Sequence, residues 1–161
     1  MEALKILIQT MDKMVDAHKQ LLEMAKGKQT ILVDGNIQEL QSHVYREGLC
    51  VEKIQKLEQV RKHYVQVYME QKGIHSDSFT LGELIEVQTD ESSRITLTKI
   101  AKQLRKIIQE ISDLNESNQK LIQASLSYIQ YSVGMFAKKE PAIGYGPNAK
   151  NRYSNMLDAK I

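Results

Sequence analysis

The residues best spaced to bind a metal ion are His43, Glu47 and Cys50. In a helix the positions i, i+4 and i+7 share one face, so an imidazole, a carboxylate and a thiolate would point the same way. No second group of ligands completes a coordination shell, and the four histidines form no His-x3-His pair. An ordinary polar helix face accounts for the same three residues more simply. We therefore predict no metal and no cofactor.

Residue patterns typical of catalysis are not found in this sequence. There is no Ser/His/Asp arrangement, nucleophile elbow or dinucleotide fingerprint, and Gly144-Tyr145-Gly146 is too short for a phosphate loop. The acidic residues are spread among lysines, as on solvated helix faces. We predict that the protein is not an enzyme.

The charge of the chain argues against nucleic acid as a partner. The formal net charge is only +2. One stretch contains a basic set that acidic residues follow at once, namely Lys99, Lys102, Arg105 and Lys106 and then Glu110, Asp113 and Glu116. No aromatic residues that could stack on bases accompany this set, so a solvated helix face explains it better than nucleic-acid binding.

The composition indicates one all-α domain. A chain of 161 residues is long enough for a modest core. Both prolines, Pro141 and Pro147, lie in the last 21 residues, and no segment alternates apolar and polar residues as a half-buried strand would. Cys50 is the only cysteine, which excludes an internal disulfide and fits a reducing cytoplasm. We expect no membrane insertion, because no apolar run approaches roughly 18 residues. We expect no secretory signal peptide, because Met1-Glu2-Ala3-Leu4-Lys5 is not a charged n-region followed by an unbroken apolar block.

The longest helical pattern covers residues 92–136, and we expect the rest of the chain to pack against it. At 1.5 Å per residue this helix would be roughly 65 Å long, which suits an elongated bundle. Asn118 falls in the apolar seam, where an amide either fixes the register of packed helices or marks a solvent-facing irregularity. The candidate N-caps are Thr89, Asp90 and Ser92. Apolar positions recur in steps of three and four, at Leu97, Ile100, Leu104, Ile107, Ile111, Leu114, Leu121, Tyr128 and Phe136.

Two other long helices and a short one precede it. A coiled-coil-like seam predicts a first helix over residues 3–33, and Asp34-Gly35-Asn36 supplies a tight turn into an antiparallel second helix over residues 37–72. Gly48, inside the second helix, is expected to mark a close helix crossing. A capping box at residues 80–83 predicts a short helix over one end of the bundle. The expected fold is an elongated antiparallel bundle of three long helices, with a short bridging helix and a flexible C-terminal tail.

The chain divides into a helical bundle, residues 1–138, and a tail, residues 139–161. From Lys138 onward five basic and two acidic residues give +3, whereas the 17 basic and 18 acidic residues before it give −1. The tail is rich in Gly, Pro and Asn, yet it contains Tyr145, Tyr153, Met156 and Leu157. Such a segment either folds on a partner or is a frayed terminus without a role.

The layout of three long helices and a tail, together with three stretches in this order along the chain, carries a family resemblance. They are Leu21-Leu22-Glu23, the end of the last helix at residues 118–130, and Tyr145-Gly146-Pro147-Asn148 in the tail. Over nearly its full length the chain resembles the FlgN-type flagellar export chaperones, which are small cytoplasmic all-helical proteins. The resemblance implies binding of the C-terminal segments of hook-associated proteins of the FlgK and FlgL types. It also implies delivery of these clients to export-gate or ATPase components of the type III export apparatus.

In that family the last helix and the tail are the expected client-binding region. An apolar helix end with a tail able to order over it also fits a helix-in-groove site. The alternative is a structural coiled-coil adaptor that self-associates without chaperone activity. The client, the choice between monomer and homodimer, and masking of the site by the tail stay open. The resemblance places partner-binding residues at Leu121, Ser125, Tyr128, Ile129, Val133 and Phe136 on the helix and at Tyr145, Tyr153, Met156 and Leu157 in the tail.

Overall fold

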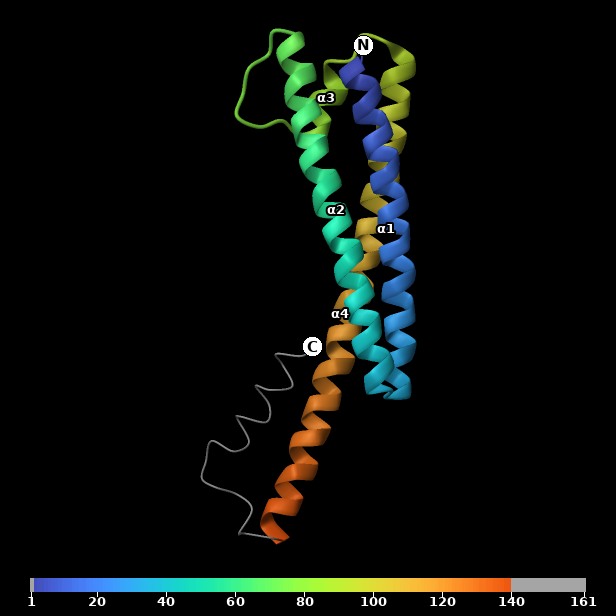
Figure 1. Ribbon diagram of the computed structural model, residues 1–161, viewed down its shortest axis with the longest axis vertical. Coiled ribbons are helices and arrows are strands. Elements are labelled where there is room, and N and C mark those ends of the chain that lie inside the picture. Colours follow the sequence, from blue (N-terminus) through green and yellow to red (C-terminus); the bar gives the residue numbers. More distant parts are fainter. Residues whose placement is uncertain (1, 140–161) are drawn as a thin grey trace.

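The computed structural model is an elongated bundle of helices (Figure 1). It describes residues 2–139, apart from the side chains of Ile129 and residues 136–139. The described residues form α1 (Glu2–Asp34), α2 (Ile37–Gln71), α3 (Leu81–Glu86) and α4 (Glu91–Lys139), and they contain no strand. The predicted all-α architecture of three long helices and one short bridging helix is confirmed. Apart from Lys139, the predicted tail lies outside the described residues.

α1 is the helix that joins the other two long helices. It runs antiparallel to α2 and parallel to α4, and it packs along both, whereas α2 and α4 make few direct contacts (Figure 1). Its buried positions form a wide face, which includes the small residues Ala17 and Ala25 and larger ones such as Met14 and Leu22. The expectation that the other helices pack against the last one is confirmed for α1 and α3 and wrong for α2, which packs on α1, so α1 holds the central place.

Turn and cap residues account for where the helices begin and end. Gly35 has a φ of 72°, a left-handed conformation that favours glycine, and it separates α1 from α2. The side chain of Asn36 caps α2 by accepting a hydrogen bond of 3.1 Å from the N–H of Glu39. Thr80 and Glu83 form the predicted capping box, in which each side chain accepts a bond from the other residue's N–H.

Hydrogen bonds tie the start of α4 to α2 and α3. Of the three candidate caps Asp90 is the one used, because its carboxylate accepts bonds from the hydroxyl (2.8 Å) and the N–H (3.0 Å) of Ser93. These two bonds lower the pKa of Asp90. The buried Gln88 accepts a bond of 3.1 Å from the hydroxyl of Tyr68, and its backbone carbonyl accepts one of 2.8 Å from Arg94. The junction between α3 and α4 is thus hydrogen-bonded to α2 through Tyr68 and to α4 through Arg94.

The largest of the fully buried side chains lie at this same end of the bundle, where all four helices meet. They are Leu7, Met11, Val65, Tyr68, Met69, Leu84 and Leu97. In the other half α2 packs more loosely, since only His43 and Cys50 are buried among residues 37–64. Several of its apolar residues remain exposed there, among them Ile37, Tyr45 and Leu49.

The close approach between helices lies at Gly27 and not at Gly48. A Cβ atom added at Gly48 would meet nothing within 4 Å, so the expectation of a helix crossing there is wrong. A Cβ atom added at Gly27 would lie 3.3 Å from Cε1 of His43, on the neighbouring helix. Helix propensity alone could not distinguish the two positions, because it does not tell which side of the helix a glycine occupies.

Candidate protein-binding surface on the last helix

The three residues with metal-like spacing hold α2 against α1. His43 Nε2 lies 2.6 Å from the carbonyl oxygen of Met24, and the Cys50 thiol donates to the carbonyl of Ala17 at 3.4 Å. Glu47 forms a half-buried ion pair of 3.4 Å with Lys28 of α1. Burial raises the pKa of the Cys50 thiol, which keeps the thiol protonated and poorly reactive. Among residues 2–139 no three His, Cys, Asp or Glu side chains are grouped as metal ligands.

α4 continues beyond the end of the α1/α2 hairpin (Figure 1). Nδ2 of Asn118 donates a hydrogen bond of 3.1 Å to the carbonyl oxygen of Ala25 and places these residues at the same level. Because α1 and α4 run parallel, Asp34 at the end of α1 lies level with about residue 127 of α4. The last 12 or so residues of α4, roughly 18 Å of helix, therefore extend past the hairpin.

The side chains of α4 become less buried toward the end that extends past the hairpin. Ile111, Asn118 and Ile122 are buried against the bundle, and Leu121 is half-buried. After Ile122 no residue with a described side chain is buried. We call residues 123–139 the projecting end of α4, although its first turn still lies level with the α1/α2 hairpin. Figure 1 shows no other described helix beside its last turns.

The predicted helical site residues lie on and just before the projecting end of α4, and Val133 faces a different side of the helix from Tyr128. Ser125 is exposed and its hydroxyl donates to the carbonyl of Leu121 at 3.0 Å, Tyr128 is 72% exposed, and Val133 is half-buried. The backbones of Ile129 and Phe136 belong to α4, but their side chains are not described. The four predicted tail residues, Tyr145, Tyr153, Met156 and Leu157, lie outside the described residues.

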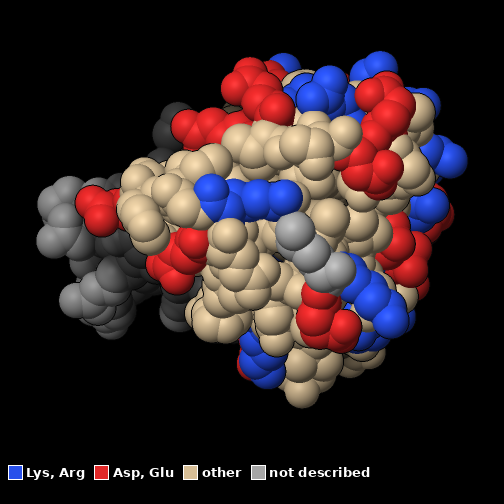
Figure 2. All heavy atoms as spheres, turned by 90° about the horizontal axis from the view of Figure 1, so that it is seen from above, with Lys and Arg blue, Asp and Glu red and all other residues tan. Residues whose placement is uncertain are grey.

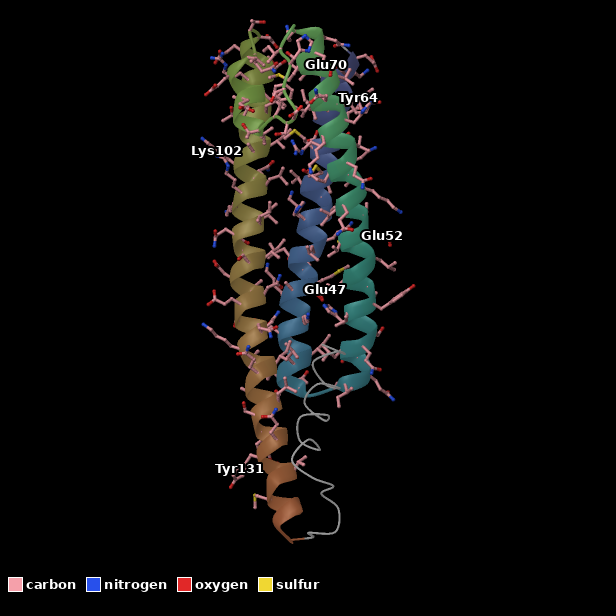
Figure 3. All side chains as sticks on the ribbon, turned by 90° about the vertical axis from the view of Figure 1, so that its left-hand side faces the viewer. Glu47, Glu52, Tyr64, Glu70, Lys102 and Tyr131 are labelled. Atoms are coloured by element: carbon pink, nitrogen blue, oxygen red, sulfur yellow. The ribbon has the colours of Figure 1, made fainter. Side chains whose placement is uncertain are left out.

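Two exposed residues of this surface were not predicted. Tyr131 is 67% exposed and Met135 is 45% exposed, and both share a helix face with Tyr128 through steps of three and four. Figure 3 shows the Tyr131 side chain extending outward from the projecting end. The signal that could have found them is the charge pattern, since residues 121–137 form the longest uncharged stretch of the sequence. Even so, no helix within the described part of the chain is long and apolar enough to span a membrane.

This arrangement suits the binding of an apolar protein segment. Two phenol rings and a thioether in one row offer apolar area, while the phenol hydroxyls can still bond to water or to a partner. Thioethers adapt their shape to different partners. An exposed apolar row on a helix without a neighbouring helix is a recurrent mark of a protein-binding surface.

Comparison with known proteins agrees with this description. The family model described as FlgN protein matches residues 1–152, which is nearly the entire chain. No curated protein and no solved structure matches the chain. The FlgN family is a family of flagellar export chaperones and not of enzymes. The match over most of the length, together with the long-helix bundle, shows that this chain belongs to the FlgN family.

Proposed function

We propose that the protein is a cytoplasmic export chaperone that binds the C-terminal segments of hook-associated proteins of the FlgK and FlgL types. The observation that supports this proposal most is the projecting end of α4. There an uncharged stretch of helix exposes Tyr128, Tyr131 and Met135 where no described helix covers them. Family membership supplies the general role of an export chaperone, and this surface supplies a place for a client.

Binding proceeds by coupled folding of the client. The client segment forms an amphipathic helix whose apolar side lies along the exposed row of α4, as in other helix-in-groove complexes. Ordering the segment costs free energy, which the burial of apolar area offsets. While covered, the segment cannot pair with other client molecules, so the client stays unassembled until it reaches the export-gate or ATPase components.

The tail, residues 139–161, completes the site in this proposal. Its apolar residues Tyr145, Tyr153, Met156 and Leu157 order over the bound client and increase the buried area. Deleting residues 139–161 is expected to leave helicity nearly unchanged in circular dichroism, because most of α4 and all other helices remain. Client affinity is expected to fall at least tenfold. An unchanged affinity would remove the tail from the site.

The helix part of the site is tested by replacing its exposed tyrosines. Tyr128→Ser and Tyr131→Ser should each weaken binding of a client C-terminal fragment at least tenfold, because each removes an exposed aromatic ring from the contact surface. Tyr45→Ser is the matched control, since Tyr45 is 69% exposed but lies on α2, outside the projecting end of α4. Equal losses for all three variants would contradict the proposed location of the site.

The alternative is a coiled-coil adaptor that self-associates. It draws support from exposed apolar residues at the α1/α2 turn, Val33 and Ile37, which a second copy could cover. Light scattering separates the two functions and also decides between monomer and homodimer. A mass that rises with concentration, without capture of any client fragment, favours the adaptor.

A further inference from the structure

The outer side of the first half of α4 carries a group of cations far from the projecting end. We call it the basic stripe: Arg94, Lys99, Lys102, Arg105 and Lys106. Lys99, Lys102 and Lys106 lie on the side of α4 opposite the buried Leu97 and Leu104, and Figure 3 shows Lys102 directed away from the bundle. Arg94 and Arg105 flank that side. The end of the bundle seen in Figure 2 differs, because basic and acidic side chains alternate around it.

The charges of the basic stripe are not neutralised by neighbours. None of its five cations forms an ion pair with any residue in the described part of the chain, whereas Lys26, Lys28, Lys56 and Lys120 do. Within residues 91–109 Glu91 is the single acidic residue, so this stretch carries +4. A concentrated charge of one sign attracts partners of the opposite sign and speeds their association.

A shallow hollow at one end of the basic stripe has an apolar centre. Its volume is about 390 Å³, and it is lined by Glu91, Arg94, Ile95, Thr98, Lys99 and Lys102. Ile95 is 60% exposed there, beside three cations. Arg94 is held in place by its bond to the carbonyl of Gln88, so little side-chain freedom is lost when its other N–H groups bind a carboxylate.

We propose that the basic stripe docks an acidic amphipathic helix of a second partner protein. Carboxylates one turn apart on that helix pair with Arg94, Lys99 and Lys102, and an apolar side chain between them covers Ile95. Nucleic acid fits less well, because a phosphate backbone gains nothing by covering isoleucine and the basic stripe has no aromatic ring for base stacking. A membrane surface fits less well too, since interfacial helices need a continuous apolar face.

The proposed surface is separate from the client site. Lys102 and Tyr131 are 29 residues apart on one helix, which is roughly 44 Å. One chaperone molecule can therefore hold a client at the projecting end and the acidic partner at the basic stripe at the same time.

The test uses the full chain and a synthetic 16-residue helical peptide with glutamates flanking two leucines on one face. Binding is measured by fluorescence anisotropy at low and high salt, and the contact is located by chemical shifts of backbone amides. We expect shifts confined to residues 91–106 and a binding constant that weakens with salt. Lys99→Glu with Lys102→Glu should weaken binding at least tenfold, because both cation contacts become repulsive.

Two controls separate this proposal from general charge attraction. Lys13→Glu with Lys62→Glu changes the net charge equally on exposed sites of α1 and α2, and should alter peptide affinity less than twofold. Ile95→Ser should weaken peptide binding at least threefold. Tighter binding of a single-stranded oligonucleotide or of phosphatidylglycerol vesicles than of the peptide, unaffected by Ile95→Ser, would overturn the proposal. A salt-sensitive dimer that Lys99→Glu with Lys102→Glu dissociates would also overturn the proposal, because an acidic segment of a second copy would then occupy the basic stripe.

Discussion

Asn118 is a buried amide whose side chain makes one hydrogen bond within the described part of the chain. Its Nδ2 donates to the carbonyl of Ala25, but its Oδ1 has no partner among the described residues. A buried acceptor without a partner costs about 1–3 kcal/mol, which exceeds the roughly 1 kcal/mol that the single bond contributes. Of the two interpretations left open by the sequence, the buried position in the helix seam is the one observed, in keeping with a residue that fixes register at a cost in stability.

Replacing this amide should therefore stabilise the fold. Asn118→Leu is expected to raise the free energy of unfolding by about 1 kcal/mol, because it removes the unpaired acceptor and adds apolar burial. Asn115→Leu is the control on an exposed position of the same helix and should change stability little. Urea denaturation followed by circular dichroism measures both. A loss of stability in Asn118→Leu would mean that the bond to Ala25 outweighs the unpaired oxygen.

Glu58 and Arg61 form the most tightly bonded charged pair of the described residues. Two N–H groups of Arg61 bond to the two carboxylate oxygens at 2.6 and 2.7 Å. The hydrogen bonds from Arg61 lower the pKa of Glu58 from its ordinary value of 4.5. Because the folded-state pKa is depressed, the pair stabilises the protein above pH 4.5, and this contribution is lost as the pH falls through the folded-state pKa.

Glu58→Gln is expected to reduce the free energy of unfolding by about 0.5 kcal/mol at pH 7, a value typical of a partly exposed pair. The difference from the unmodified protein should shrink steadily as the pH is lowered from 5 toward 2. Urea denaturation over this pH range measures it. A difference that stays constant with pH would show that the carboxylate charge is not what stabilises this part of α2.

At the scale of single helices, two glycines in comparable positions should respond differently to the same change. Gly48→Ala is expected to stabilise the protein by about 1 kcal/mol, because α2 has open space there and alanine has the higher helix propensity. Gly27→Ala should gain less or lose stability, since the added Cβ atom would lie 3.3 Å from His43. Thermal unfolding of the two variants compares them directly. Equal gains in stability would show that the α1/α2 contact at Gly27 accommodates the added methyl group without loss of stability.

The helices could be predicted from the sequence because their boundaries depend on neighbouring residues. Gly35, Asn36 and the Thr80–Glu83 capping box act over a few residues, and the observed helix ends lie close to the predicted ones. The central place of α1 depends instead on where three helices meet in space. The strong apolar periodicity of α4 favoured it as the predicted centre of the bundle. α1 is the observed centre, because its small residues let a neighbouring helix pack on each of two sides.

The candidate surface was only partly predictable for a similar reason. A search for apolar positions in steps of three and four finds the row that continues the core, which includes Leu121 and Val133. Tyr131 and Met135 follow Tyr128 in steps of three and four but were missed, because exposure depends on where the neighbouring helices end. Their membership of the longest uncharged stretch was visible in the sequence, but its meaning depends on the length by which α4 extends past the hairpin.

The molecule as a whole separates its largest buried side chains from the proposed client-binding surface along its long axis. The largest fully buried side chains and the polar junction around Gln88 lie at one end, and the exposed row of α4 lies at the other. A partner bound at the projecting end therefore disturbs little of the core. In the proposed function, this arrangement lets a small bundle stay folded while the end of α4 orders a client.

The proposed function requires that the protein capture a client with burial of apolar surface. Calorimetric titration of the full chain with a C-terminal fragment of a hook-associated protein, repeated at several temperatures, tests this requirement. We expect saturable, submicromolar binding with one client per chain and a binding enthalpy that becomes more negative on warming, which is a negative heat-capacity change. No heat of binding at any of these temperatures would contradict it and favour the adaptor.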